Sequence, residues 1–101
     1  MANIKKKLDS LDSQVDKRKL VFTKNGWQDY QYWRTTDQAK FTKLNELIEA
    51  AQVSLHSGIG KPERLTSNLK GYYSRRIDRE HRLIYKSVNG DLVIFAARFH
   101  Y

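Results

Sequence analysis

The sequence predicts an α+β domain in which an N-terminal helical hairpin packs on one face of an antiparallel sheet, in the order β-α-α-β-β-β. Apolar residues recur at helical spacing within residues 38–53, whereas residues 72–99 show the two-residue alternation of strands. An Asn-Gly pair between two β-branched runs indicates a tight hairpin. With 101 residues, the chain has the length of one small domain.

The first half of this domain is expected to contain one strand and two helices. Residues 19–22 are expected to form a short strand. Thr23 is a suitable N-cap for a helix over residues 24–34, and Asp37 is one for a helix that ends near Val53. The apolar stripe of the second helix is Phe41, Leu44, Leu47, Ile48 and Ala51.

The second half predicts three strands, over residues 72–78, 81–88 and 91–99. A type I′ turn at Asn89-Gly90 would pair residue 88 with 91, and therefore residue 82 with 97. Simple alternation then places Arg82 on the same face as Tyr101 and the opposite face from His100. A bulge or a loss of strand geometry near the end would be needed to bring Arg82 and His100 together.

Residues 1–18 differ in character from the domain over residues 19–101. Their apolar side chains lie on one helical face and are surrounded by charged residues. An isolated helix of this length is marginal in water. We therefore expect an N-terminal extension that is helical or flexible.

Composition narrows the range of functions. The net charge is +8, and eight cations but only three acids lie between Lys61 and Lys86, which favours a polyanionic partner. The chain has no cysteine, no long apolar run and no evident secretory signal, so we expect a cytoplasmic protein without membrane contact. The three histidines lack the spacing of a metal site, and we expect no metal and no cofactor.

General acid–base chemistry on RNA fits the remaining residues. RNA carries its own nucleophile, the 2′-hydroxyl, so cleavage needs a base, an acid and a cation near the phosphate. Glu63 is a candidate base, and the imidazole of His100 titrates near neutral pH. Arginines on the predicted strands, among them Arg82, are candidate cations.

Residues 19–101 resemble the YoeB/Txe toxins of the RelE superfamily. The matching segments are WQDYQYW (27–33), KLNELI (43–48), GIGKPERL (58–65), NLKGYYSRRI (68–77), EHRLIY (80–85) and ARFHY (97–101). The resemblance implies a microbial-ribonuclease-like fold and a ribosome-dependent mRNA endonuclease. It also implies a YefM-like antitoxin and a homodimer. Residues 1–18 are additional to the family pattern.

The resemblance also implies roles for individual residues. Glu63 would act as the general base, Arg82 would stabilise the phosphate, and Arg76 would make a supporting phosphate contact. His100 would supply the acid, and Tyr101 would orient the substrate.

Further phosphate contacts are expected from three other cations in the same stretch, namely Lys61, Arg64 and Arg75. Two alternatives stay open at this point. The chain could be a basic module that binds ribosomal RNA without cutting it, or a gyrase-poisoning relative from the same superfamily.

Overall fold

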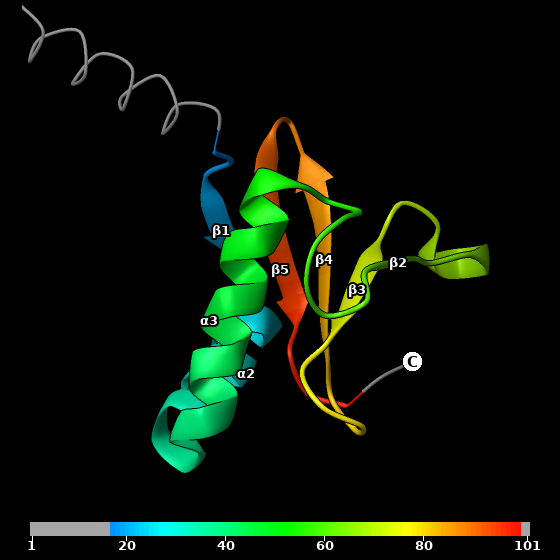
Figure 1. The fold of residues 1–101 in the computed structure, drawn as a ribbon. Coiled ribbons are helices and arrows are strands. Elements are labelled where there is room, and N and C mark those ends of the chain that lie inside the picture. The colour runs from blue at the N-terminus through cyan, green and yellow to red at the C-terminus, as the bar shows by residue number, and fades with distance from the viewer. Residues whose placement is uncertain (1–16, 100–101) are drawn as a thin grey trace, which may run out of the picture.

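The computed structural model describes residues 17–99, in which two helices cover one face of a five-stranded sheet (Figure 1). The elements in chain order are β1 (Leu20–Phe22), α2 (Lys24–Thr36), α3 (Gln38–Val53), β2 (Glu63–Arg64), the 3₁₀ helix η1 (Ser67–Leu69), β3 (Tyr73–Arg76), β4 (Arg82–Val88) and β5 (Asp91–Ala96). Within residues 17–99, neither helix is long and apolar enough to cross a bilayer.

The predicted helix caps are confirmed. The Thr23 side chain accepts a hydrogen bond from the Gly26 backbone N–H at 3.0 Å, and the Asp37 carboxylate accepts one from the Lys40 backbone N–H at 3.1 Å. These bonds satisfy N–H groups that have no partner within the first helical turn. Helix α2 continues to Thr36, beyond the predicted end at residue 34, so Asp37 alone separates the two helices.

The strand order is β1-β5-β4-β3-β2, and the predicted α+β class is confirmed. The sheet is mixed, however, because β1 pairs in parallel with β5, with Leu20 opposite Leu92. A parallel neighbour requires a long crossover rather than a tight turn. Here β1 and β5 are separated in the chain by both helices and the other strands. The β3–β4 and β4–β5 pairs are antiparallel, as predicted. The two-residue strand β2, which pairs antiparallel with β3, was not predicted and makes the sheet five-stranded.

The turn at Asn89-Gly90 has the predicted conformation, since φ is +52° at Asn89 and +86° at Gly90. The predicted pairing of Arg82 with residue 97 is wrong. The register shifts between Ile84 and Tyr85, and the Arg82 N–H donates to the Phe99 carbonyl at 2.9 Å. One extra residue on β5 causes this bulge. The alternation argument that separated Arg82 from His100 therefore does not hold.

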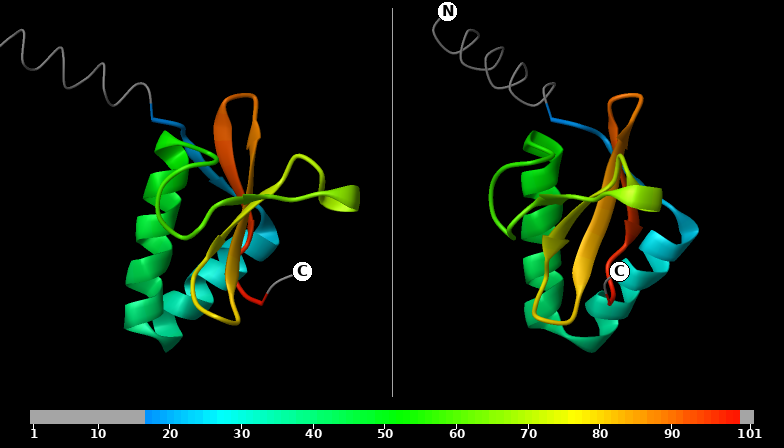
Figure 2. Two further views of the ribbon diagram at one scale, coloured as in Figure 1. Left: turned by 45° about the vertical axis from the view of Figure 1, so that its right-hand side comes forward. Right: turned by 90° about the vertical axis from the view of Figure 1, so that its right-hand side faces the viewer.

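The core lies between the sheet and the two helices, which share one face of the sheet (Figure 2). Its buried apolar side chains include Trp33 of α2, Leu44 and Leu47 of α3, and Leu83 and Ile94 of the sheet. The opposite face of the sheet carries no α-helix within the part of the chain that the structure describes; only the short 3₁₀ helix η1 lies on that side. This uncovered side is called the open face below.

The predicted extension over residues 1–18 lies outside the described residues except for Lys17 and Arg18. The Arg18 N–H donates to the Gln52 carbonyl at 3.2 Å, and the Gln52 side-chain amide donates to the Arg18 carbonyl at 2.9 Å. These reciprocal bonds attach the entry into β1 to the end of α3.

Candidate active site on the open face

Three neighbouring strands align side chains on the open face. Glu63 of β2 is the register partner of Ser74 on β3, and Ser74 is the partner of Ile84 on β4. Directly opposed residues share one face of a sheet. Arg82 lies two residues before Ile84 on β4 and faces the same way, opposite its own partner Arg76 on β3. The strand register therefore brings the predicted base and two predicted phosphate-binding arginines onto one surface.

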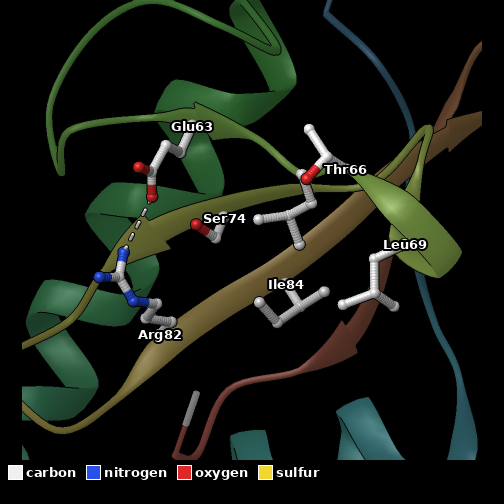
Figure 3. Close-up of a pocket in the computed structure, with 7 residues that line it drawn as sticks. Glu63, Thr66, Leu69, Ser74, Arg82 and Ile84 are labelled. Atoms are coloured by element: carbon white, nitrogen blue, oxygen red, sulfur yellow. Dashed lines mark ion pairs between the residues drawn. The ribbon is translucent and has the colours of Figure 1, made fainter. Parts of the chain in front are cut away.

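This surface contains a cavity of about 230 Å³, called here the Glu63–Arg82 cavity (Figure 3). The segment around η1 forms one wall, and strands β3 and β4 form its floor (Figure 3). Its lining residues are Glu63, Leu65, Thr66, Leu69, Ser74, Arg82 and Ile84. The cavity thus combines one carboxylate, one guanidinium and two hydroxyl groups with three apolar side chains.

Glu63 and Arg82 face each other across the mouth of the cavity (Figure 3). One Glu63 carboxylate oxygen, Oε2, lies 3.5 Å from Arg82 Nη1. The Glu63 side chain is 65% exposed and that of Arg82 is 22% exposed, so the carboxylate is accessible while the guanidinium is held against the sheet. This distance is longer than that of a strong charge-assisted hydrogen bond. The pair is therefore loose enough for another anion to compete for Arg82.

Two buried polar atoms in this cavity have no hydrogen-bond partner. Among the described residues, only Ser74 Oγ, Arg82 Nη1 and Arg98 Nε are buried side-chain N or O atoms without one. Burying such a group without a partner costs about 1–3 kcal/mol. Ser74 and Arg82 both line the cavity. Both atoms are buried in the free protein, and an anion that binds in this cavity would be their partner.

A tight turn delivers Glu63 to this position. Gly60 and Lys61 both have positive φ, of +84° and +50°, and Pro62 follows them. A Cβ at Gly60 would lie 2.4 Å from a Leu47 methyl group, so this close approach to α3 requires glycine. The Gly60 carbonyl accepts a hydrogen bond from the Arg76 N–H at 2.7 Å, which fixes the turn against the end of β3.

The structure corrects the predicted role of Arg75. This residue is fully buried on the helix-covered side of the sheet, not on the open face. Its guanidinium donates to the carbonyls of Ser54, Ser57 and Ile59 at 2.6–2.7 Å and to the Tyr85 hydroxyl at 2.9 Å. Arg75 therefore connects the α3–β2 loop to the sheet, and its donors are occupied by the protein itself.

The other predicted phosphate-binding cations are exposed but do not share one location. Arg76 follows Arg75 on β3 and lies opposite Arg82. Lys61 and Arg76 line a different cavity from Glu63, at the edge of the sheet next to α3. Arg64 is paired with Tyr73, and its guanidinium lies 5.8 Å from the centre of the Tyr73 ring. Lys61 and Arg64 are not among the residues that line the Glu63–Arg82 cavity.

A clamp of side chains holds the segment that leads to the C-terminus. The Asp29 carboxylate accepts from the Ala97 N–H at 2.9 Å, and the Trp33 indole donates to the Ala97 carbonyl at 2.7 Å. His81 Nδ1 accepts from the Phe99 N–H at 2.7 Å. These bonds fix the backbone immediately before His100. The predicted acid His100 and the predicted orienting residue Tyr101 themselves lie outside the described residues.

Asp29, Trp33 and His81 had no predicted functional role. Each is buried and bonded to backbone more than 15 residues away, so no local pattern indicates the contact. Within the EHR segment (residues 80–82), only Arg82 had a predicted role. Its neighbour His81 has its ring centre 4.8 Å from that of Trp33, and together they support the last described residues of the chain.

Asp78, in the β3–β4 turn, connects the hairpin to α3. Its Oδ2 lies 2.8 Å from the Lys40 ammonium, and its Oδ1 accepts from the backbone N–H groups of Glu80 and His81. Partial burial acts to raise the pKa of Asp78, but the hydrogen bonds from Lys40 and the backbone outweigh it and lower the pKa below its ordinary value. The same hydrogen bond raises the pKa of Lys40.

Comparisons with known proteins cover most of the chain. The family model described as "YoeB-like toxin of bacterial type II toxin-antitoxin system" matches residues 22–101. The toxin YoeB of Escherichia coli K12 is 46% identical over 83 residues, which are 82% of this chain and 99% of that protein.

Two solved structures extend the similarity to the fold. A YoeB dimer from Staphylococcus aureus is 40% identical, with a TM-score of 0.77 over 84% of this chain and 99% of that chain. A YoeB–YefM complex from the same organism is 39% identical, with a TM-score of 0.76 over 83% and 98% of the two chains. The similarity includes the strands and the turn that form the Glu63–Arg82 cavity.

Proposed function

Because the chain belongs to the YoeB-like toxins of bacterial type II toxin–antitoxin systems, we propose that it is an endoribonuclease that cleaves mRNA on the ribosome. The observation that carries this proposal is the Glu63–Arg82 pair, 3.5 Å apart, beside the partner-free Ser74 hydroxyl in one cavity. An accessible carboxylate next to a partly buried guanidinium is the arrangement that transfer of a proton beside a phosphate requires.

The proposed reaction uses the RNA 2′-hydroxyl as nucleophile and needs neither metal nor cofactor. Glu63 removes the 2′-hydroxyl proton while the 2′-oxygen attacks phosphorus, and the bond from phosphorus to the 5′-oxygen breaks. His100 gives a proton to the departing 5′-oxygen, and Tyr101 orients the nucleotide. Arg82 stabilises the charge on the phosphate, with Arg76 in support. The products are a 2′,3′-cyclic phosphate, or a 3′-phosphate after hydrolysis, and a 5′-hydroxyl.

The loose ion pair supports this division of roles. In the free protein the Glu63 carboxylate partly neutralises Arg82. A phosphate that binds Arg82 would compete with that carboxylate for the guanidinium and leave the carboxylate oxygens free to accept a proton, and the same phosphate could accept a hydrogen bond from the Ser74 hydroxyl. The Glu63 carboxylate thereby stays accessible to the substrate, while Arg82 is held in place by β4.

We also propose that the chain forms a homodimer and binds a YefM-type antitoxin in the cytoplasm. Solved relatives from Staphylococcus aureus are a YoeB dimer and a YoeB–YefM complex. An acidic antitoxin segment would complement the net charge of +8. Such a segment could also cover the open face, which bears both Glu63 and Arg82.

The test is end mapping of mRNA on programmed ribosomes with the Glu63→Gln variant. Loss of a general base lowers a cleavage rate by about 10²–10⁴-fold. We expect that loss for Glu63→Gln, with ribosome binding retained. Glu46→Gln removes another exposed carboxylate, on α3, and should cleave normally. An mRNA with a single 2′-deoxy substitution at the cut site should resist the native chain.

The outcomes separate this function from its two alternatives. If Glu63→Gln arrests translation as well as the native chain does, and no new RNA ends appear with either, the protein is a binding module. Cleaved DNA bound to gyrase, with intact mRNA, would instead identify a gyrase poison.

A further inference from the structure

A second cavity of about 390 Å³ lies at the sheet edge, between α3, the turn at residues 60–61 and the β3–β4 turn. Four cations line it: Lys43 from α3, Lys61 from the first turn, Arg76 from β3 and Arg79 from the second turn. Its one acidic lining residue is Asp78. The cavity is separate from the Glu63–Arg82 cavity, and its lining includes none of the residues that line the latter.

The charge of this second cavity is not neutralised by the fold. Asp78 is already paired with Lys40 at 2.8 Å. Within residues 17–99, none of the four cations lies within 4.0 Å of a carboxylate. Like charges around one concave surface repel each other, and a concave, low-dielectric wall strengthens their common field. The four cations therefore repel one another in the free protein, and a bound anion would offset that repulsion.

We propose that the second cavity binds a phosphate of the RNA strand next to the one that is cut. This inference rests on the proposed function for the identity of the polymer, while the anion site itself rests on the four cations. Arginine presents forked donors suited to phosphate, and lysine adds a point charge.

The position of Arg76 relative to Arg82 indicates a continuous track. Arg76 and Arg82 are register partners on adjacent strands and share the open face, and neighbouring strands are spaced about 4.8 Å apart. Arg76 lines the second cavity, and Arg82 lines the first. A single strand whose scissile phosphate contacts Arg82 can therefore place a neighbouring phosphate near Arg76, within reach of Lys43 and Arg79. This continuity favours a nucleic-acid strand over an isolated small anion.

The experiment measures binding, so it does not depend on cleavage. The probe is a fluorescent 2′-O-methyl RNA of about eight nucleotides, which lacks the nucleophile and cannot be cut by the proposed reaction. The full chain carrying Lys43→Gln and Arg79→Gln is compared with one carrying Lys24→Gln and Arg34→Gln. The second pair removes the same charge from exposed positions on α2.

Loss of the two cavity cations should weaken binding roughly tenfold, whereas the α2 variant should stay within about twofold. The slope of log affinity against log salt should fall by about 1.4 for the cavity variant, because each lost phosphate contact on a single strand contributes about 0.7. Matching thermal unfolding midpoints would show that the cavity variant is folded.

Three results would overturn the inference. Equal losses for both variants would mean that only net charge matters, and no loss for either would mean that the cavity does not touch RNA. If the cavity variant keeps RNA affinity but loses affinity for an oligoglutamate peptide, the cavity binds an acidic protein segment. The binding probe cannot be cut, so this experiment and the cleavage assay can fail independently. If Glu63→Gln loses mRNA cleavage while the cavity variant binds the probe normally, the proposed function stands and the second cavity is not an RNA site.

Discussion

The two faces of the sheet treat their polar groups in opposite ways. Ser74 and Arg75 are consecutive residues of β3 and both are fully buried. On the helix-covered face, the Arg75 guanidinium donates four hydrogen bonds to oxygen atoms of the protein. On the open face, Ser74 Oγ and Arg82 Nη1 have no hydrogen-bond partner. The helix-covered face therefore uses the polar groups of Arg75 to hold the loop, whereas the open face leaves two polar groups without a partner.

This difference separates structural from functional cations better than charge or sequence position does. Buried polar groups normally have partners, because an unmade hydrogen bond costs free energy. A group that stays unsatisfied in a small domain lowers stability, and proteins accept such losses where ligands bind. The comparison predicts that substitutions on the helix-covered face damage folding, whereas those on the open face damage RNA binding and cleavage.

The largest effect should come from Arg75→Ala. The change leaves three carbonyl groups and the Tyr85 hydroxyl without their donor, and it frees the α3–β2 loop. We expect the free energy of unfolding to fall by about 3 kcal/mol or more, measured by urea denaturation. Arg76→Ala, at the next position and exposed, should change it by no more than about 0.5 kcal/mol. Equal losses would remove the distinction between the two faces.

Arg75 also shows where reasoning from the sequence ends. The caps Thr23 and Asp37 and the Asn89-Gly90 turn follow local rules, and each was predicted correctly. Alternation could tell that Arg75 and Arg76 face opposite ways, but not which face the helices cover. That choice depends on packing between distant segments, so charge alone placed Arg75 among the phosphate ligands.

The bulge between Ile84 and Tyr85 limited the site prediction in the same way. One extra residue changes which side chains oppose each other, and nothing in the alternating run marks it. Glu63 and Arg82, which were candidates from composition and from the family resemblance, do lie close together, but alternation along the strands could not show it. The second cavity was not predicted, since Lys43 and Arg79 come from a helix and a turn 36 positions apart in the chain.

The next largest effect is expected for His81→Leu. This variant tests whether the buried His81 holds the backbone that leads to His100. Leucine cannot accept the hydrogen bond from the Phe99 N–H that His81 Nδ1 accepts. We expect a loss of about 2 kcal/mol in stability and faster hydrogen exchange at the Phe99 amide. His81→Asn places an acceptor oxygen near the Nδ1 position and should restore part of the protection. Unchanged exchange in His81→Leu would contradict the clamp.

Ser74→Ala should have a smaller effect, which raises the stability of the fold and lowers the affinity for RNA. Removal of a buried hydroxyl that has no partner should raise the free energy of unfolding by about 1 kcal/mol. Affinity for the 2′-O-methyl RNA should fall by about fivefold, because the phosphate loses a donor. Ser87→Ala, a half-buried serine on β4, is the control and should change neither quantity appreciably. A destabilised Ser74→Ala variant would show that the hydroxyl is bonded after all.

The smallest effect is expected for Asp78→Asn, which removes the charge that attaches the hairpin to α3. The lowered pKa of Asp78 means that its ionised form stabilises the fold fully above the unfolded value of about 3.9 and loses that contribution as the pH falls through the folded value. The raised pKa of Lys40 means that its contribution is present below about 10.4 and is lost as the pH rises through the folded value.

The native chain should therefore exceed Asp78→Asn in unfolding free energy by a constant amount between about pH 5 and 9, and the gap should shrink at both extremes. Urea denaturation across this range measures the difference, and a gap that persists at pH 2 would show that the ion pair is not its source. At neutral pH the same variant removes the single acid from the lining of the second cavity. Its RNA affinity should rise slightly, so the substitution that weakens the helix-covered side strengthens anion binding.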